Sequence, residues 1–161
     1  MLWLIAQGAK VVACEVSETA VQEFFDDNQI TYILANEKDF KVYKAKGITI
    51  YCGDFFKLKL DDDFDFIYDR ASMVALPKKM RQDYVDKISS FLAINGDYYL
   101  FIFTYDQTLM SGPPFSIALD EITERFKTYS RVDVVFEEKF VSDFHGQQLD
   151  SKRSVLHMRR Q

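Results

Sequence analysis

The sequence is poor in the residues that indicate an exported, zinc-binding or membrane-spanning protein. It has two cysteines, Cys14 and Cys52, which lie inside apolar runs and show no C-x-x-C spacing. Neither a disulfide framework nor a zinc site is therefore predicted. No run approaches the ~20 apolar residues of a membrane helix, and no basic segment followed by an apolar run and a cleavage site opens the chain. We expect a soluble protein of the cytoplasm.

Positive charge is also scarce. The chain has 20 Lys and Arg against 25 Asp and Glu, a formal net charge of -5. A nucleic-acid backbone as main partner needs a basic face, so this balance argues for a small-molecule ligand instead. The two histidines, His145 and His157, stand alone in the sequence, and we expect both to be structural or surface residues and no metal to be bound.

Apolar and helical patterns predict one domain of alternating strands and helices. With 161 residues, 48% of them hydrophobic, the chain suffices for a single domain over residues 1–161. Apolar runs predict strands at residues 11–14, 48–52, 64–68, 98–104, 132–136 and 154–158. Helical spacing predicts helices ending at Gly8, beginning at the N-cap Ser17, at 78–92, and at 118–126 with Ser116 as cap. Residues 32–43 fit either a hairpin or a surface excursion.

The predicted fold class is α/β, with a Rossmann-like, mostly parallel sheet covered on both faces. The continuous apolar run at 11–14 is typical of a strand buried on both faces. The last two strands are expected to form an antiparallel pair joined by the polar loop around His145 and Gly146. Ligands of such sheets bind beyond the carboxyl ends of the strands, so the candidate site residues are those that follow strands.

Two of these strand ends carry groups that suit an adenosine. Glu15 ends the first strand, where a carboxylate can accept the hydroxyls of a ribose; the plainer interpretation is a solvated loop carboxylate. Asp54 and Phe55 follow the strand at 48–52 and pair an acceptor for an adenine amino group with an apolar ring. Alternatively, Asp54 caps a local turn and Phe55 belongs to the core.

The later strand ends carry candidates for the reacting end of a ligand. Arg70 follows Asp69, and its guanidinium could stabilise a carboxylate or an anionic sulfur, or merely pair with Asp69. Asp106 and the proline loop at 112–115 follow the strand at 98–104. This loop could close over a planar substrate, or it could only steer the chain into the next helix.

Together, these segments resemble the thiopurine S-methyltransferase family, particularly its bacterial members. The similarity is carried by residues 11–18, 23–25, 50–56, 68–77 with 80–81, 105–107 and 112–116. The resemblance implies methyl transfer from S-adenosyl-L-methionine to the sulfur of an aromatic or heterocyclic thiol, with tellurite or selenite detoxification in some bacterial relatives. It implies that Glu15 binds the ribose, that Asp54 and Phe55 contact the adenine, and that Arg70 lies near the methionine end and the substrate, where it has a catalytic role. It implies no dedicated base.

The sequence departs from the family pattern at its start and near Gly146. The family's N-terminal segment, first strand and glycine loop have no counterpart here, so we expect an incomplete gene product whose sheet is either split where that central strand would lie or repaired by other means. A complete form is expected to be monomeric. Near Gly146, where some relatives have arginines, this chain has Val141, Phe144 and His145.

Two other functions compete with the methyltransferase. A catalytically silent remnant could bind a partner through the apolar surface that the missing strand exposes. A nicotinamide-dependent oxidoreductase could use Glu15 on the ribose, but its glycine fingerprint would fall in the missing region, and the downstream segments argue against it.

Overall fold

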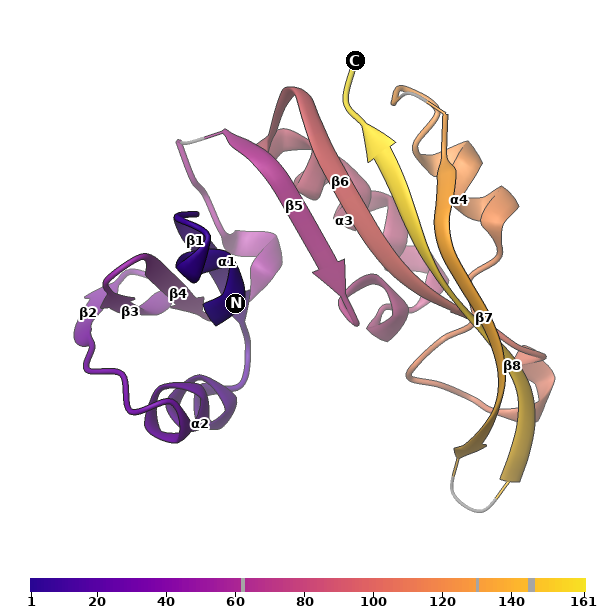
Figure 1. The fold of residues 1–161 in the computed structure, drawn as a ribbon, viewed down its shortest axis with the longest axis horizontal. Helices are drawn as coiled ribbons and strands as arrows, with labels where there is room; N and C mark the ends of the chain where they lie inside the picture. Colours follow the sequence, from indigo (N-terminus) through magenta and orange to yellow (C-terminus); the bar gives the residue numbers. More distant parts are fainter. Residues whose placement is uncertain (62, 130, 145–146) are drawn as a thin grey trace. The chain divides into compact units, whose positions relative to one another are not determined.

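The computed structural model describes residues 1–161 apart from 62, 130 and 145–146 (Figure 1). The chain divides into two compact units, Met1–Lys59 and Leu60–Gln161. Each unit contains one four-stranded sheet. Among the described residues, no helix is long and apolar enough to cross a membrane.

The first unit has a mixed sheet whose strands follow the order β1-β4-β3-β2. Its elements are α1 (Leu2–Ala6), β1 (Val11–Glu15), α2 (Glu18–Asp27), β2 (Ile33–Glu37), β3 (Phe40–Ala45), β4 (Ile48–Cys52) and the 3-10 turn η1 (Phe55–Lys57). Strands β1 and β4 are parallel, whereas β2, β3 and β4 pair antiparallel. Residues 32–43 thus contain the β2–β3 hairpin, which decides between the two interpretations of that stretch.

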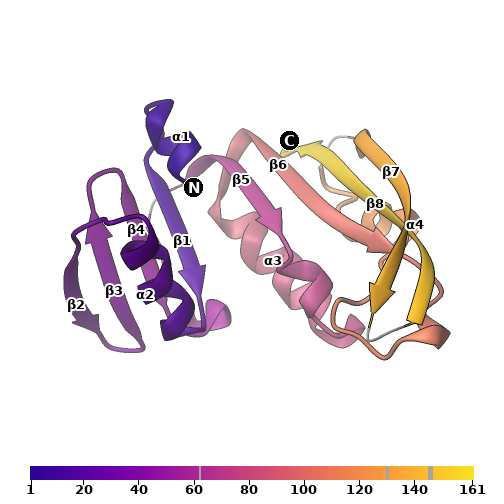
Figure 2. The ribbon, with the colours of Figure 1, turned by 60° about the horizontal axis from the view of Figure 1, so that its bottom comes forward.

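One face of the first sheet is covered by α2, as Figure 2 shows. The Ser17 side chain accepts a hydrogen bond from the Ala20 amide at 3.3 Å, which confirms the predicted N-cap. From α2, Val21 and Phe25 are fully enclosed, and the Phe25 ring stacks on Tyr43 of β3 with 5.9 Å between centroids. The apolar spacing of α2 therefore forms the core of this unit.

The second unit has a mixed sheet in the order β5-β6-β8-β7. Its strands are β5 (Phe64–Arg70), β6 (Leu92–Thr104), β7 (Asp133–Phe144) and β8 (Gln147–Arg159). Its helices are α3 (Arg81–Phe91) and α4 (Leu119–Arg125), with short 3-10 turns η2 (Met73–Ala75), η3 (Lys78–Met80) and η4 (Gln107–Leu109). Figure 1 shows α3 behind β5 and β6. Tyr98, Leu100 and Ile102 alternate along β6 and are buried, and Tyr98 packs on Phe126 after α4.

The α/β class and the antiparallel C-terminal pair β7/β8 are confirmed, but the sheets are mixed rather than mostly parallel. Only β1/β4 and β5/β6 pair in parallel among the described strands. Strands β1 and β5 are end strands of different sheets, so of the two alternatives, a split sheet or a repaired one, the structure has the split. For the same reason β1 is not buried on both faces, and Val12 is 37% exposed. That residues 1–161 form one domain stays a prediction.

Two element boundaries differ from the prediction because distant backbone groups compete for them. Asn95 and Gly96 do not end a helix; they belong to β6, where the Asn95 amide donates to the Arg160 carbonyl and the Arg160 amide donates to Gly96. Ser116 is not the cap of α4, whose N-cap position is Ala118. The Ser116 hydroxyl is hydrogen-bonded to the backbone of Tyr105 instead. The predicted loop at His145 and Gly146 lies outside the described residues.

Candidate functional site

The carboxyl ends of β1 and β4 meet at one edge of the first sheet. Glu15 pairs with Cys52 in the parallel ladder, and the Gly53 amide donates to the Glu15 carbonyl at 2.9 Å. The Glu15 side chain is exposed, and its Oε1 accepts a hydrogen bond from the Ser17 amide at 2.8 Å. This bond fixes the carboxylate at the beginning of α2. The structure therefore places Glu15 at a strand end, as predicted.

Asp54 and Phe55 follow directly after the neighbouring strand. Asp54 Oδ1 accepts a hydrogen bond from the Phe56 amide at 2.9 Å and caps the turn η1, as the alternative interpretation of Asp54 has it. The Asp54 side chain is nevertheless exposed, and Phe55 is half-buried, with its ring 5.9 Å from that of Phe56. The structure thus brings together Glu15, Asp54 and Phe55 at one sheet edge, with two exposed carboxylates and a half-buried aromatic ring.

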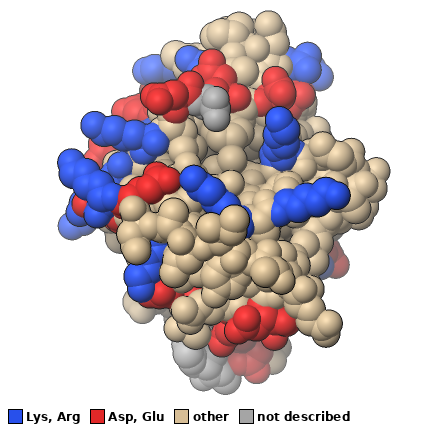
Figure 3. All heavy atoms as spheres, turned by 90° about the vertical axis from the view of Figure 1, so that its left-hand side faces the viewer, with Lys and Arg blue, Asp and Glu red and all other residues tan. Residues whose placement is uncertain are grey.

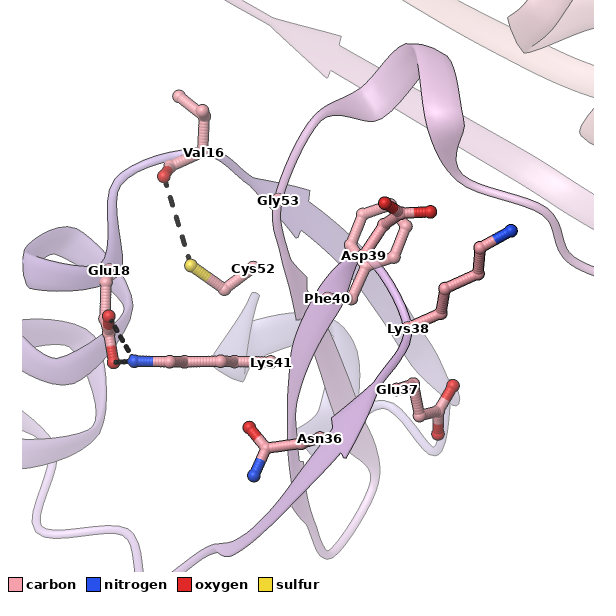
Figure 4. Close-up of a pocket in the computed structure, with 10 residues that line it drawn as sticks. All are labelled: Val16, Glu18, Asn36, Glu37, Lys38, Asp39, Phe40, Lys41, Cys52 and Gly53. Carbon is pink, nitrogen blue, oxygen red and sulfur yellow. Dashed lines mark hydrogen bonds and ion pairs between the residues drawn. The ribbon is translucent and has the colours of Figure 1, made fainter.

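A shallow pocket of about 380 Å³ lies beside these residues (Figure 4). Val16 and Gly53, the neighbours of Glu15 and Asp54 in the chain, line it together with the turn of the β2–β3 hairpin. Glu18 binds Lys41 across the pocket at 2.7 Å, and the hydrogen bond from Lys41 lowers the pKa of this carboxyl. Sequence reasoning missed this pocket because the hairpin was left undecided.

In the second unit, Arg70 ends β5 with its side chain exposed. The Asp69 carboxylate is bonded to the Tyr84 and Tyr98 hydroxyls, at 2.7 and 2.8 Å, and not to Arg70. The proposed Asp69–Arg70 ion pair is therefore wrong. Among the described residues, none forms an ion pair or side-chain hydrogen bond with Arg70, so its guanidinium is available to an anionic group.

The loops after β5 and β6 are tied together in this unit. The Phe115 amide donates to the Val74 carbonyl at 2.6 Å, and the Tyr105 hydroxyl donates to the carbonyl of Pro114. Asp106, by contrast, caps the turn η4 through the Thr108 amide at 3.0 Å. The proline loop therefore lies beyond the carboxyl end of β6, beside the loop that follows Arg70.

The buried Arg81 supports this loop, a role that was not predicted from the sequence. Its side chain is 3% exposed and binds Glu121 of α4 at 2.9 Å, and its guanidinium carbon lies 5.9 Å from the centre of the Phe115 ring. No signal in the sequence distinguishes Arg81 from a surface arginine, because Glu121 lies 40 residues away. Within the described part of the chain, no group of three or more His, Cys, Asp or Glu side chains could hold a metal ion.

The sequence profile of the thiopurine S-methyltransferase family matches residues 1–159. The chain belongs to this family. It is 37% identical over 146 residues to a thiopurine S-methyltransferase of Pseudomonas fluorescens (strain Pf0-1), covering 89% of this chain and 66% of the relative. A relative from Pseudomonas syringae pv. syringae (strain B728a) is 44% identical over 119 residues, 73% of this chain and 54% of its own length. The chain thus spans a little over half to two thirds of these curated relatives.

This chain has the same fold as several solved S-adenosylmethionine-dependent methyltransferases. One such protein from Methanosarcina mazei aligns with a TM-score of 0.67 at 12% identity, covering 99% of this chain and 85% of its own. TehB from Haemophilus influenzae aligns with a TM-score of 0.65 at 14% identity, covering all of this chain and 53% of its own. NodS from Bradyrhizobium japonicum WM9, solved with S-adenosyl-L-homocysteine, aligns at 0.63 and 12% identity over 94% of this chain and 66% of its own. S-adenosyl-L-methionine is the cofactor of this family.

Proposed function

We propose that this chain carries out S-adenosyl-L-methionine-dependent methyl transfer to the sulfur of a small aromatic or heterocyclic thiol. The observation that carries the proposal is the pair of carboxylates, Glu15 and Asp54, at the carboxyl ends of two neighbouring parallel strands. Membership of the thiopurine S-methyltransferase family supports the reaction class.

The residues at this edge fit the adenosine end of the cofactor. Glu15 is exposed, and a carboxylate there can accept hydrogen bonds from both hydroxyls of a ribose. Asp54 can accept from the amino group of an adenine, and the half-buried Phe55 ring offers an apolar face to its plane. When bound, S-adenosyl-L-methionine would supply an activated methyl group that a thiolate can attack in line.

Arg70 is the residue that we assign to the reacting end. Its guanidinium can bind the carboxylate of the cofactor, and it can favour the ionised form of an incoming thiol. A thiolate needs alignment and exclusion of water rather than a strong base. The tied loops after β5 and β6, with Phe115 half-buried between them, suit a flat ring substrate.

The finer assignments belong to the same proposal. Lysines and arginines are interspersed with acidic residues on the face shown in Figure 3, which suits a small molecule better than a nucleic acid. We propose a cytoplasmic detoxification enzyme, with tellurite or selenite as further substrates, and a monomer in its complete form.

Titration calorimetry of S-adenosyl-L-homocysteine into the 161-residue chain tests the cofactor site. We expect binding by the chain, and a loss of affinity of about tenfold in Glu15→Gln, because the amide removes a charge that strengthens the hydrogen bonds to the ribose. Glu23→Gln is the matched control, since Glu23 is an exposed carboxylate of α2 away from the strand ends. The full-length Pseudomonas syringae relative serves as a reference for the assay.

The outcomes separate the proposed functions. Binding that depends on Glu15 but not on Glu23 supports the methyltransferase. If the chain fails to bind S-adenosyl-L-homocysteine while the reference binds it, the cofactor site proposed for this chain is wrong. Concentration-dependent self-association without cofactor binding would favour the silent interaction protein, whose supporting observation is the exposure of Phe66 and Tyr68 on the end strand β5, at 44% and 51%.

A further inference from the structure

Asp69 is a deeply buried carboxylate with an unusual set of partners. Its side chain at the end of β5 is 3% exposed. Oδ2 accepts hydrogen bonds from the Tyr84 and Tyr98 hydroxyls at 2.7 and 2.8 Å, and Oδ1 accepts the Ser72 amide at 3.2 Å. The Met73 amide also donates to this carboxylate. Every one of these partners is neutral, so the negative charge is held by hydrogen bonds alone.

These bonds join three elements to one turn. Tyr84 belongs to α3 and Tyr98 to β6, whereas the two amides lie in the turn that follows Arg70. Burial raises the pKa of the Asp69 carboxyl against the opposing effect of its hydrogen bonds. An apolar side chain would fill this position without that desolvation cost. Packing alone therefore does not explain a carboxylate at this position. Its hydrogen bonds do, because they hold the turn.

The turn needs to be held because it is strained. Ala71, which follows Arg70, has φ at +70°, in the left-handed region where the Cβ of an L-residue lies too close to the following carbonyl oxygen. The backbone bonds from Ser72 and Met73 to Asp69 fix the chain immediately beyond this residue. Arg70 thus lies between a strand on one side and an anchored turn on the other, which restricts the direction of its side chain.

We propose that Asp69 is a positioning residue for Arg70: the Asp69 carboxylate holds the turn at 70–73 and so restricts the direction of the Arg70 guanidinium, which the proposed function assigns to the cofactor. The inference rests on the proposed function, because it assigns Arg70 to the cofactor. It adds a buried positioning group, with its two tyrosines, to the exposed residues of the site.

Calorimetric titration of S-adenosyl-L-homocysteine in a double-mutant cycle tests this role. Asp69→Asn keeps the shape of the side chain but places an amide group where the carboxylate accepts hydrogen bonds from the Tyr84 and Tyr98 hydroxyls. We expect its affinity to fall about tenfold in the native background, the scale of one lost hydrogen bond to a charged group. In the Arg70→Ala background the same change should have no further effect, since Asp69 acts only through Arg70. A merely structural role would lower affinity equally in both backgrounds.

One control and two alternative test variants keep the result interpretable. Tyr129→Phe removes another tyrosine hydroxyl of the second unit, bonded to Ser89 at 2.8 Å, and should leave affinity unchanged. If Asp69→Asn does not fold, Tyr84→Phe and Tyr98→Phe each remove one bond to Asp69 and should weaken binding about threefold, again only when Arg70 is present.

Each result decides the matter. A loss confined to the native background supports the inference, whereas an unchanged affinity, or an equal loss without Arg70, overturns it and leaves the proposed function standing. Failure of the unsubstituted chain to bind S-adenosyl-L-homocysteine overturns the proposed cofactor site and this inference together.

Discussion

The backbone amide of Gly53 donates a hydrogen bond to the carbonyl oxygen of Glu15 over 2.9 Å, one residue beyond the last pair of the β1/β4 ladder. This bond extends the parallel pairing into the loops and fixes the separation of the two strand ends. Because Glu15 precedes one loop and Asp54 begins the other, the spacing of their side chains depends on Gly53. Substitution at this glycine therefore tests both the packing and the site.

Gly53→Ala should destabilise the first unit and weaken cofactor binding. A Cβ added at Gly53 would lie 2.6 Å from the Phe40 ring and 2.8 Å from the Asp39 carbonyl oxygen. The ring can turn, but the carbonyl belongs to the backbone of the hairpin, so the strand end must shift. We expect a loss of roughly 1–3 kcal/mol in the free energy of unfolding, the usual range for overpacking, measured by urea denaturation.

Gly8→Ala is the control for the general cost of adding a methyl group. A Cβ at Gly8 meets nothing within 4 Å, and the φ of +89° is the one source of strain there. Its cost should be that of the left-handed backbone alone, about 1–2 kcal/mol, and cofactor affinity should not change. Equal affinities for S-adenosyl-L-homocysteine in Gly53→Ala and the parent chain would show that the strand ends do not set the site.

The Arg81–Glu121 pair should contribute far more to stability than an exposed pair does. Arg81 is 3% and Glu121 16% exposed, so Arg81→Met leaves a largely buried carboxylate whose remaining ion-pair partner among the described residues is Arg125, at 2.8 Å. We expect a loss of about 3 kcal/mol, the lower end for breaking a buried pair, because Arg125 remains. Lys127→Met breaks the Lys127–Glu124 pair, which is 71% and 77% exposed, and should cost under about 1 kcal/mol. Similar urea midpoints for both variants would contradict this account.

The two thiols of the chain should be unreactive near neutral pH. Burial raises the pKa of the Cys14 thiol to about 11, with Glu15 and Asp54 adding to the effect, and it also raises the pKa of Cys52. At pH 8 about one thousandth of Cys14 is then thiolate, the reactive form. Alkylation by iodoacetamide, followed by mass spectrometry, should accelerate about tenfold for each pH unit up to 11. Alkylation at pH 8 as fast as that of an unstructured cysteine peptide would show the thiols to be accessible.

Local patterns in the sequence predicted the residues at the strand ends. An apolar run followed by a charged residue predicted β1 with Glu15 and β5 with Asp69 and Arg70, and the structure has both. The N-cap Ser17 also correctly predicted the beginning of α2, because its hydrogen bond spans only three residues. Signals of this range depend on neighbours in the chain, which a sequence displays directly.

What the sequence could not predict depends on partners far along the chain. The start of β6 was missed because Arg160, 65 positions after Asn95, pairs with its backbone. Ser116 is of a residue type that often caps helices, but its hydroxyl is hydrogen-bonded to Tyr105 instead. Asp69 does not pair with Arg70; it accepts hydrogen bonds from two tyrosines that lie 15 and 29 residues away. Each case is a polar group with several possible partners, and the fold selects the one that packing brings close.

The buried Asp69 carboxylate should make the free energy of unfolding depend on pH. Burial raises the pKa of Asp69 above its ordinary 3.8, so the folded state binds this proton more tightly than the unfolded state does. The resulting stabilisation is fully present below the unfolded pKa and is lost as pH rises through the folded pKa. Asp69→Asn has no titratable group at this position and serves as the reference. The contributions of the other carboxylates cancel in the difference between the two free energies of unfolding. The free energy of unfolding of the parent chain minus that of Asp69→Asn should therefore fall as the pH rises above the ordinary pKa of the carboxyl, 3.8, in urea titrations. A difference that is flat or rises with pH would mean that the hydrogen bonds from Tyr84 and Tyr98 outweigh the desolvation of the carboxylate.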